Sequence, residues 1–321
     1  MTPAQLERAV RFAALHRGPA PLVLPNAWDA ASALLYTSAP VGLFLATFVN
    51  FQIAGRFWKN DPEVSWRYVF LSGLLPAAAA FLVRLFIKEP ERWKQAAAGA
   101  RPPRLAELFD SRHRAITLSG FFMAVTALVT WWSCNAFIPV VSTGLAQAEA
   151  AVRGLDRAAT LALVEGWKKV ATNYFNLGGL IGTLLTIPAA KVMGRKAMFA
   201  IYYAASAAVV LASFGLDLSP ETRLVMYFLN GLTVFGVFGS FTYYLPELFP
   251  TRLRGTGAGF CYNIGRVIAA AGPILVGSIA SKGANSLESA LHALFWVGFV
   301  PLAGLAFLPW VIETKGRALV D

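Results

Sequence analysis

Charged residues are scarce in this sequence: Asp, Glu, Lys and Arg make up only 14% of its 321 residues, whereas 57% are hydrophobic. Soluble domains ordinarily contain about 25% charged residues, so the composition argues against a soluble protein and predicts an integral membrane protein. The net charge of +11 does not indicate nucleic-acid binding. The basic residues do not form one stripe but cluster in short loops between apolar runs, as in membrane proteins.

Motifs for catalysis and metal binding are also missing. The two cysteines, Cys134 and Cys261, lie in apolar runs without the spacing of a metal site or a disulfide. The sequence contains no recognisable nucleophile–histidine pair, phosphate-binding loop or cluster of metal ligands. We therefore do not expect an enzyme, and we expect neither a cofactor nor a bound metal.

Long apolar runs are what the sequence has in abundance. A helix needs about 20 apolar residues to cross the hydrocarbon core of a lipid bilayer, and eight segments qualify. They cover residues 38–55, 66–87, 115–145, 170–190, 197–216, 224–245, 256–280 and 288–311. The sequence therefore predicts an all-α integral membrane protein with about eight transmembrane helices.

The loops between these segments predict their orientation. Residues 88–114 form the longest strongly basic loop, which the positive-inside rule places in the cytoplasm. Every second loop is then cytoplasmic and basic, while the intervening loops mix both signs. An even number of spans puts both termini in the cytoplasm, and we expect the protein in the inner (plasma) membrane.

One outer loop, residues 147–169, is unusually long. Its Ala, Leu, Glu and Arg content suits a short surface helix, but such a segment also serves as a plain connector between spans. We expect a connector here.

Two motifs resemble those of a known family. The stretch LPELFPTRLRGTGAGFCYNIGR (residues 245–266) and the tail IETKGR (312–317) are similar to elements of the major facilitator superfamily, in its sugar-porter and metabolite–proton symporter branches. In that family the first element follows the tenth helix and the second follows the twelfth. The resemblance implies a secondary transporter, whose substrate site lies between two six-helix halves.

The positions of the motifs predict which part of the family pattern is present. They follow the sixth and eighth spans here, and SWRYVFLSGLLPA (65–77) resembles the family's sixth helix but lies in the second span. We therefore expect that the first four helices of the pattern are missing. The expected parts are two helices of the N-terminal half (37–87), a central cytoplasmic loop (88–114), the six-helix C-terminal half (115–312) and a cytoplasmic tail (313–321).

Residues 1–36 have the composition of a soluble protein, unlike the apolar segments that follow them. RFAALHRGPAPLVLPNAWDAASA resembles the start of the isocitrate lyase/phosphoenolpyruvate mutase superfamily, a family of Mg²⁺-dependent barrel enzymes. Such a barrel needs about 250 residues, and none of its later metal-binding or catalytic segments is visible. We therefore interpret residues 1–36 as a fragment of that kind and expect no catalysis from it.

Arg266 lies deep in an apolar span. It is ten residues beyond Thr256, where the span begins, which corresponds to ~15 Å along a helix and the middle of a ~30 Å hydrocarbon core. A charge there costs about 2.5–3.5 kcal/mol, so Arg266 should face a wet cavity or a partner. Since the corresponding part of the eleventh helix lines the central cavity in the resembled family, we expect Arg266 to bind an anionic substrate, for instance a carboxylate. The alternative is a structural pair with an acidic residue.

Uncharged polar and aromatic residues within the spans are further candidates for a cavity wall. Asparagine in a membrane helix often bonds to another helix instead, and mid-span tryptophan often packs in the interior. With these alternatives open, the candidate substrate-binding residues besides Arg266 are Asn263, Asn135, Asn173, Asn176 and Trp131.

Four charged residues lie at the predicted cytoplasmic ends of the spans: Glu247, Arg252, Arg254 and Arg195. Arg195 belongs to IPAAKVMGRKA, a degraded form of a family motif in which Lys191 replaces the usual aspartate of a charge latch. The four residues could still form a latch, or they could belong to solvated loops, where ion pairs contribute only ~0–1 kcal/mol.

The sequence thus favours a transporter of a small organic metabolite, such as a carboxylate, coupled to protons. Without four helices, one wall of the substrate cavity would be incomplete, so we expect a monomer to be impaired and to show no concentrative uptake. The alternative is a membrane protein that does not transport, a gene-fusion remnant that at most associates with itself or with other membrane helices.

Overall fold

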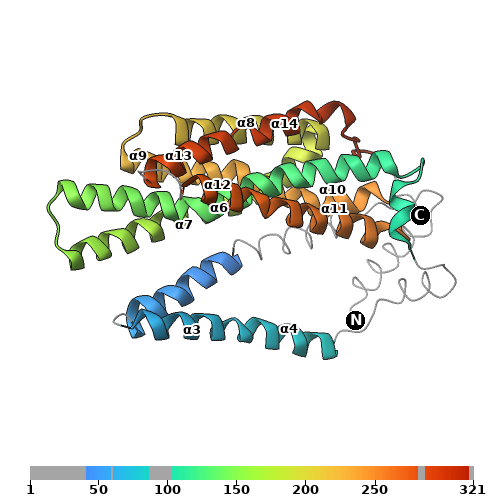
Figure 1. Ribbon diagram of the computed structural model, residues 1–321. Coiled ribbons are helices and arrows are strands. Elements are labelled where there is room, and N and C mark those ends of the chain that lie inside the picture. Colours follow the sequence, from blue (N-terminus) through green and yellow to red (C-terminus); the bar gives the residue numbers. More distant parts are fainter. Residues whose placement is uncertain (1–40, 59–60, 87–102, 281–285, 318–321) are drawn as a thin grey trace, which may run out of the picture.

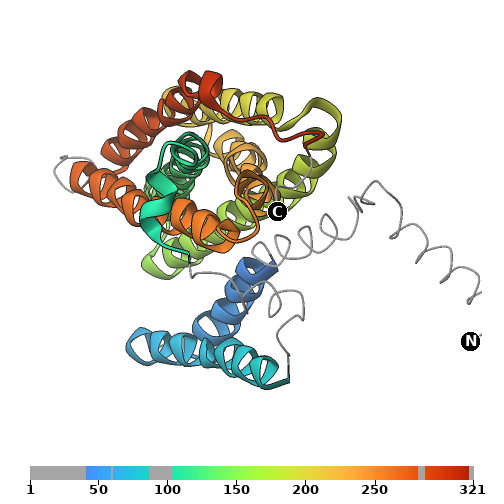
Figure 2. The ribbon, with the colours of Figure 1, turned by 90° about the vertical axis from the view of Figure 1, so that its right-hand side faces the viewer.

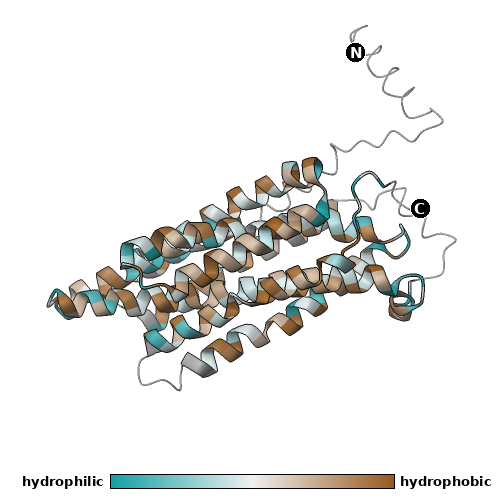
Figure 3. Cartoon of the chain, turned by 90° about the horizontal axis from the view of Figure 1, so that it is seen from above, coloured by the Kyte–Doolittle hydropathy of each residue, from teal (hydrophilic) through white to brown (hydrophobic). Residues whose placement is uncertain are grey.

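The computed structural model describes residues 41–58, 61–86, 103–280 and 286–317. The segment 1–36, most of the loop 88–114 and the end of the tail lie outside these residues, and so do the predictions made for them. The described part of the chain is helical and contains no strand, which confirms the predicted all-α fold. Hydrophilic residues gather toward the ends of the helical rods and hydrophobic residues line their length (Figure 3).

Six helical rods form a bundle (Figures 1 and 2). Each is long and apolar enough to cross a membrane, which confirms the six spans expected after the central loop. The rods are α6 (Arg114–Val152); α7 (Arg157–Met193); α8 (Arg195–Gly215); α9 (Pro220–Asn230) with the turns η3 (Gly231–Phe235) and η4 (Gly236–Ser240) and α10 (Phe241–Leu248); α11 (Arg254–Ala269) with α12 (Ala271–Ala280); and α13 (Ser286–Val297) with α14 (Val300–Ala306). A short turn, η5 (Leu308–Trp310), follows the last rod.

Of the helices before the central loop, those at 62–72 and 74–86 lie apart from this bundle (Figures 1 and 2), whereas the first helix contacts it: the Lys169 ammonium of α7 lies 4.2 Å from the centroid of the Phe51 ring. The helix Val41–Gln52 continues into the π-helical turn η1 (Ile53–Phe57), and α3 (Pro62–Ser72) is followed by α4 (Leu74–Phe86). Large apolar side chains on α3 and α4 are exposed; Phe70, for example, is 76% exposed. The first of the eight expected spans begins before the described residues, so the count of eight stays a prediction.

The prediction of a connector at 147–169 is wrong, because α6 and α7 continue through most of this segment as a helical hairpin (Figure 1). Only the turn 153–156 separates the two helices. Local contacts stabilise it, because Glu149 pairs with Arg153 at 2.6 Å and the Asp156 carboxylate accepts the Ala159 N–H at 2.7 Å. With 39 residues, α6 is ~58 Å long, well beyond the ~30 Å hydrocarbon core.

Glycines allow α7 to cross the α9–α10 rod at backbone contact. A Cβ atom at Gly178 would lie 2.0 Å from the Phe228 carbonyl oxygen, and one at Gly182 would lie 2.1 Å from the Leu232 carbonyl oxygen. From the other side, a Cβ at Gly231 would meet the Phe175 oxygen at 1.9 Å. Because the obstacles are backbone atoms, side-chain rotation cannot relieve them. The glycine-rich stretch NLGGLIG (176–182) thus allows close packing of the two helices.

The second glycine-rich stretch, GTGAG (255–259), packs only in part. Gly257 faces the Phe249 ring, where a Cβ would come within 2.5 Å, but nothing lies within 4 Å of a Cβ at Gly255. A Cβ at Gly259 would meet only the Asn263 amide, at 3.9 Å. One side of α11 is therefore closely packed, while the other side has no neighbour in the described structure.

One arginine is buried at the end of the bundle from which α9 begins. Arg223 is 4% exposed, and its guanidinium donates to the carbonyl oxygens of Ser213 and Leu216, the latter at 3.2 Å. Both carbonyls belong to the C-terminal end of α8, which carries partial negative charge. A helix end, rather than a carboxylate, thus compensates this charge.

The glycine crossing generates a testable prediction. Gly182→Ala should lower the thermal unfolding midpoint of the detergent-solubilised protein by roughly 5 °C, because the two backbones must separate to admit one methyl group. Gly166→Ala, in the same helix but with nothing within 4 Å, is the matched control and should not lower the midpoint. Equal midpoints for the two variants would contradict the close crossing.

Candidate functional site

α11 has an open face that carries two of the predicted site residues. Asn263 and Arg266 lie one turn apart on it, and both side chains are exposed. The Arg266 guanidinium lies 5.5 Å from the centroid of the Tyr262 ring, a distance at which a cation is attracted to an aromatic face. Among the described residues, no carboxylate forms an ion pair with Arg266. The alternative of a structural acidic partner therefore finds no support in this part of the chain.

A continuous set of aromatic rings leads from α11 into the bundle. The Tyr262 ring is edge-on to Phe238, with centroids 6.5 Å apart, and Phe238 lies 5.6 Å from Trp131. Beyond Trp131 the set continues to Phe235 and Phe175, at centroid distances of 5.4 and 6.1 Å. All four spacings fall in the 4.5–7 Å range of attractive aromatic pairs. We call these five rings the aromatic path; they come from α6, α7, η3, η4 and α11.

Buried polar atoms without a protein partner lie on α6 and α7. Asn176 is 1% exposed, yet neither its amide nitrogen nor its amide oxygen is hydrogen-bonded. The indole nitrogen of Trp131 and the hydroxyl of Thr183 are in the same condition. An unmet buried polar group costs about 1–3 kcal/mol, so water or a bound polar molecule is needed beside these atoms.

Asn135 and Asn173 stand near this group. Asn135 follows Trp131 by one turn of α6, Asn173 precedes Asn176 by one turn of α7, and both are half-buried. Neither has a partner among the described residues. Asn230 behaves differently, because its amide donates to the Ser213 hydroxyl at 2.7 Å, as expected for a helix-packing asparagine.

These side chains together offer a particular chemistry. The Arg266 guanidinium, which has no carboxylate partner among the described residues, adjoins the aromatic path. Amide and indole groups whose hydrogen-bonding capacity is unmet in this part of the chain lie farther inside. Such a surface suits a flat anion that stacks on rings and binds arginine through a carboxylate. Within the described ranges, no three His, Cys, Asp or Glu residues come together in a way that could hold a metal ion.

A second group of charges lies at the opposite end of the bundle from the hairpin. Arg195 Nη2 lies 2.7 Å from Glu247 Oε1, and Arg195 Nε lies 3.1 Å from Glu247 Oε2, which makes a two-pronged ion pair. The Thr314 hydroxyl donates to the same carboxylate at 2.5 Å. We call this contact the Arg195–Glu247 pair. It joins the start of α8, the end of α10 and the tail.

The tail makes a further contact beside this pair. The Glu313 carboxylate accepts the backbone N–H groups of Arg195 and Lys196, both at 3.0 Å, and so caps the start of α8 from 118 residues away along the chain. Burial by itself raises the pKa of Glu313. The N–H donors of Lys196, Arg195 and Lys315 outweigh burial and hold that pKa below its ordinary value of 4.5.

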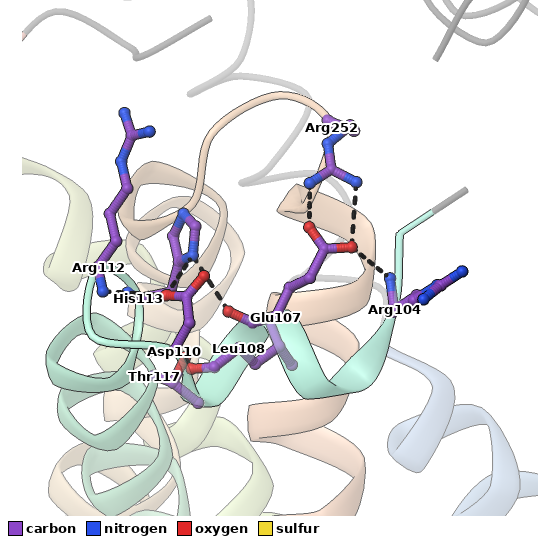
Figure 4. Close-up of polar contacts among 8 residues, drawn as sticks. All are labelled: Arg104, Glu107, Leu108, Asp110, Arg112, His113, Thr117 and Arg252. Carbon is purple, nitrogen blue, oxygen red and sulfur yellow. Dashed lines mark hydrogen bonds and ion pairs between the residues drawn. The ribbon is translucent and has the colours of Figure 1, made fainter. Parts of the chain in front are cut away.

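Of the four charged residues predicted for a latch or for solvated loops, Arg195 pairs with Glu247, whereas Arg252 and Arg254 contact other groups. The choice between a latch and solvated loops stays a prediction. The Arg254 Nε atom donates to the Pro246 carbonyl at 3.0 Å. Arg252 reaches Glu107 instead (Figure 4).

Glu107 belongs to η2 (Leu105–Phe109), a short helical turn that is fixed to the start of α6 (Figure 4). The Thr117 hydroxyl donates to the Leu108 carbonyl at 2.8 Å, and the His113 N–H donates to the Asp110 carboxylate at 2.8 Å. The hydrogen bond from Arg252 lowers the pKa of Glu107. The end of the central loop is thereby tied to the turn between α10 and α11.

Sequence reasoning missed part of the site. Phe235, Phe238 and Phe175 of the aromatic path, and Thr183, were not among the candidates. The first two belong to a run with an aromatic residue every third position, at 235, 238 and 241. That spacing indicates one aromatic helix face, but it does not reveal that Trp131 and Tyr262 meet that face.

Comparison with known proteins identifies the family. The model of the Major Facilitator Superfamily matches residues 20–273, which is most of the chain. The match also takes in part of the segment 1–36. The resemblance of that segment to isocitrate lyase and phosphoenolpyruvate mutase stays a prediction.

Several similar proteins are named as transporters. A probable 4-methylmuconolactone transporter of Cupriavidus pinatubonensis is 26% identical over 261 residues, which is 80% of this chain and 56% of that protein. The cis,cis-muconate transport protein of Acinetobacter baylyi is 26% identical over 78% of this chain and 56% of its own length. The gentisate transporter of Corynebacterium glutamicum is 23% identical over 81% and 55%.

This chain therefore spans little more than half the length of these relatives. The six membrane-length rods, the motifs at 245–266 and 312–317 and the family match agree with one another. The chain is a multi-pass membrane protein and belongs to the Major Facilitator Superfamily, a family of membrane transport proteins rather than of enzymes.

Proposed function

We propose that this chain carries the substrate-binding wall of a secondary transporter for small, flat carboxylates. The observation that carries the proposal is Arg266, which touches the aromatic path but has no carboxylate partner among the described residues. A substrate carboxylate would supply the missing anion, and its planar carbon skeleton would stack on Tyr262, the half-buried ring at the start of the aromatic path.

The relatives support this substrate class. Their printed names include 4-methylmuconolactone, cis,cis-muconate and gentisate, small acids or a lactone with unsaturated or aromatic skeletons. The buried amide of Asn176 and the indole nitrogen of Trp131 would bind the far polar end of such a molecule. Asn263, Asn135 and Asn173 are the remaining proposed contacts.

We also propose the finer features of transport. The bundle end with the basic loop would face the cytoplasm of a cell's inner membrane, as the positive-inside rule predicts, and transport would be coupled to protons. Because this chain spans little more than half the length of its relatives, binding is the activity to test before concentrative uptake.

Replacement of Arg266 tests the binding proposal. The full chain, purified in detergent, should bind cis,cis-muconate with a change in tryptophan fluorescence, and Arg266→Gln should weaken that binding by roughly tenfold or more, because a charged hydrogen-bonded contact is lost. Arg266→Lys keeps the charge but not the planar guanidinium, so its affinity for muconate should lie between those of the unaltered chain and Arg266→Gln.

Two controls accompany this measurement. Arg157→Gln removes the same charge at the exposed start of α7 and should leave muconate binding unchanged. The uncharged dimethyl ester of muconate should bind the unaltered chain and Arg266→Gln equally weakly. Full muconate affinity in Arg266→Gln would reject the proposed site and favour a membrane protein that does not transport.

We further propose that the Arg195–Glu247 pair is a latch that holds the inner end of the bundle in one conformation. Its two side chains are only 15% and 21% exposed, so the pair is less screened than a surface ion pair. Release of Glu247 would free the tail through Thr314 and the start of α8 through Arg195.

The latch predicts faster proteolysis of the tail. In Glu247→Gln, trypsin should cleave after Lys315 roughly tenfold faster than in the unaltered chain, since a two-pronged charged contact no longer holds this segment. Glu221→Gln removes an acid at the other end of the bundle, and trypsin should cleave its tail at the same rate as that of the unaltered chain. An unchanged rate in Glu247→Gln would exclude the latch.

The Glu313 contact predicts a defined pH dependence. Because folding lowers the pKa of Glu313, its stabilisation is complete well above pH 4.5 and is lost as the pH falls below 4.5 through the lowered value. Hydrogen-exchange protection of the Arg195 and Lys196 amides should decline over that window. In Glu313→Gln the protection should be weak already at neutral pH and nearly constant with pH; an unchanged pH profile would contradict the contact.

A further inference from the structure

A crevice lies on the bundle surface at the end where the central loop and the tail meet the membrane spans. Its volume is about 350 Å³, within the usual range of ligand pockets. The first two turns of α6 form one wall, with Arg114, Leu118 and Phe122, and the end of the last rod forms the other, with Phe307, Trp310 and Val311. The aromatic path and the Arg195–Glu247 pair are not part of its lining.

The interior of the crevice is apolar. The Phe122 and Phe307 rings both line it and stack directly on each other, with centroids 4.3 Å apart and planes 7° from parallel. The hydroxyl of Ser119 also lines it, but this group is already bonded to the Tyr244 hydroxyl at 2.8 Å and accepts the Ile312 N–H at 3.2 Å. The body of an occupant must therefore be apolar.

The mouth of the crevice is cationic. Arg114 is exposed, and its guanidinium has no acceptor among the described residues. Lys196 brings a second positive charge close to the same end, because its ammonium group donates to the Pro309 carbonyl at 3.2 Å, one residue before Trp310. An occupant should thus carry a negative charge beside its apolar body.

The position of the crevice along the rods identifies the surroundings. Arg114 is the first residue of α6, and Trp310 follows the last rod, so both stand where the apolar spans end. Trp310 is 69% exposed. Tryptophan and basic residues at this depth lie at the level of lipid headgroups.

We propose that this crevice binds an anionic phospholipid, with an acyl chain between Phe122 and Trp310 and the headgroup phosphate at Arg114. Under the orientation proposed above, the lipid belongs to the cytoplasmic leaflet, whose negative surface attracts basic residues near the membrane. The apolar body distinguishes this ligand from a free phosphate, which would have no use for the stacked rings.

Native mass spectrometry of the delipidated full chain tests the proposal. Phosphatidylglycerol should bind more tightly than phosphatidylcholine with the same acyl chains, and Arg114→Gln should reduce phosphatidylglycerol affinity about fivefold, to the level of phosphatidylcholine. Leu118→Trp, which fills the crevice, should weaken both lipids. Glycerol phosphate at matched concentration should not compete.

Arg112→Gln is the matched control, because it removes the same charge two residues earlier from a side chain outside the crevice lining, and it should bind phosphatidylglycerol normally. Equal losses in Arg112→Gln and Arg114→Gln, equal affinity of the unaltered chain for both lipids, or competition by glycerol phosphate would each overturn the proposal. The assay does not involve Arg266, so its failure is distinct from failure of the substrate site.

Discussion

Backbone contact between α7 and the α9–α10 rod is the constraint on which the rest of the bundle depends. Glycines at 178, 182 and 231 bring the two backbones so close that a single methyl group finds no room. This crossing fixes Phe175 against Phe235 and so positions the inner part of the aromatic path. Helix packing therefore fixes the inner rings beside the proposed substrate site.

Two arginines show how differently the bundle handles a positive charge in an apolar setting. Arg223 is buried, and its two terminal guanidinium nitrogens donate to carbonyl groups at the end of α8. Arg266 has the face of Tyr262 on one side and no anion among the described residues. A charge at this depth costs about 2.5–3.5 kcal/mol, so a favourable interaction must offset it. The carboxylate of the proposed substrate would provide that interaction.

Local sequence patterns predicted the membrane-spanning helices well, but they did not predict which side chains from different helices contact one another. Apolar runs indicated the six spans, and the depth of Arg266 singled it out, because both follow from residue order alone. The partner of Glu247 could not be settled in this way: Arg252 and Arg254 are nearer in sequence, yet they bind Glu107 and the Pro246 carbonyl, and Arg195 pairs with Glu247. The hairpin at 147–169 was misjudged because its alanine-rich helix extends past the membrane, where hydrophobicity no longer marks it.

The length of that hairpin has a mechanical meaning. Because α6 and α7 each run as one helix from the end of the bundle that holds the Arg195–Glu247 pair to the tip at 153–156, the tip stands ~28 Å beyond the hydrocarbon core. If the bundle rocks as a rigid unit, a small rotation within the bilayer becomes a large sideways sweep of this arm in the aqueous phase. The position of the arm would then report the conformational state of the bundle. A protein that binds the arm could stop the rocking without contacting the proposed substrate site.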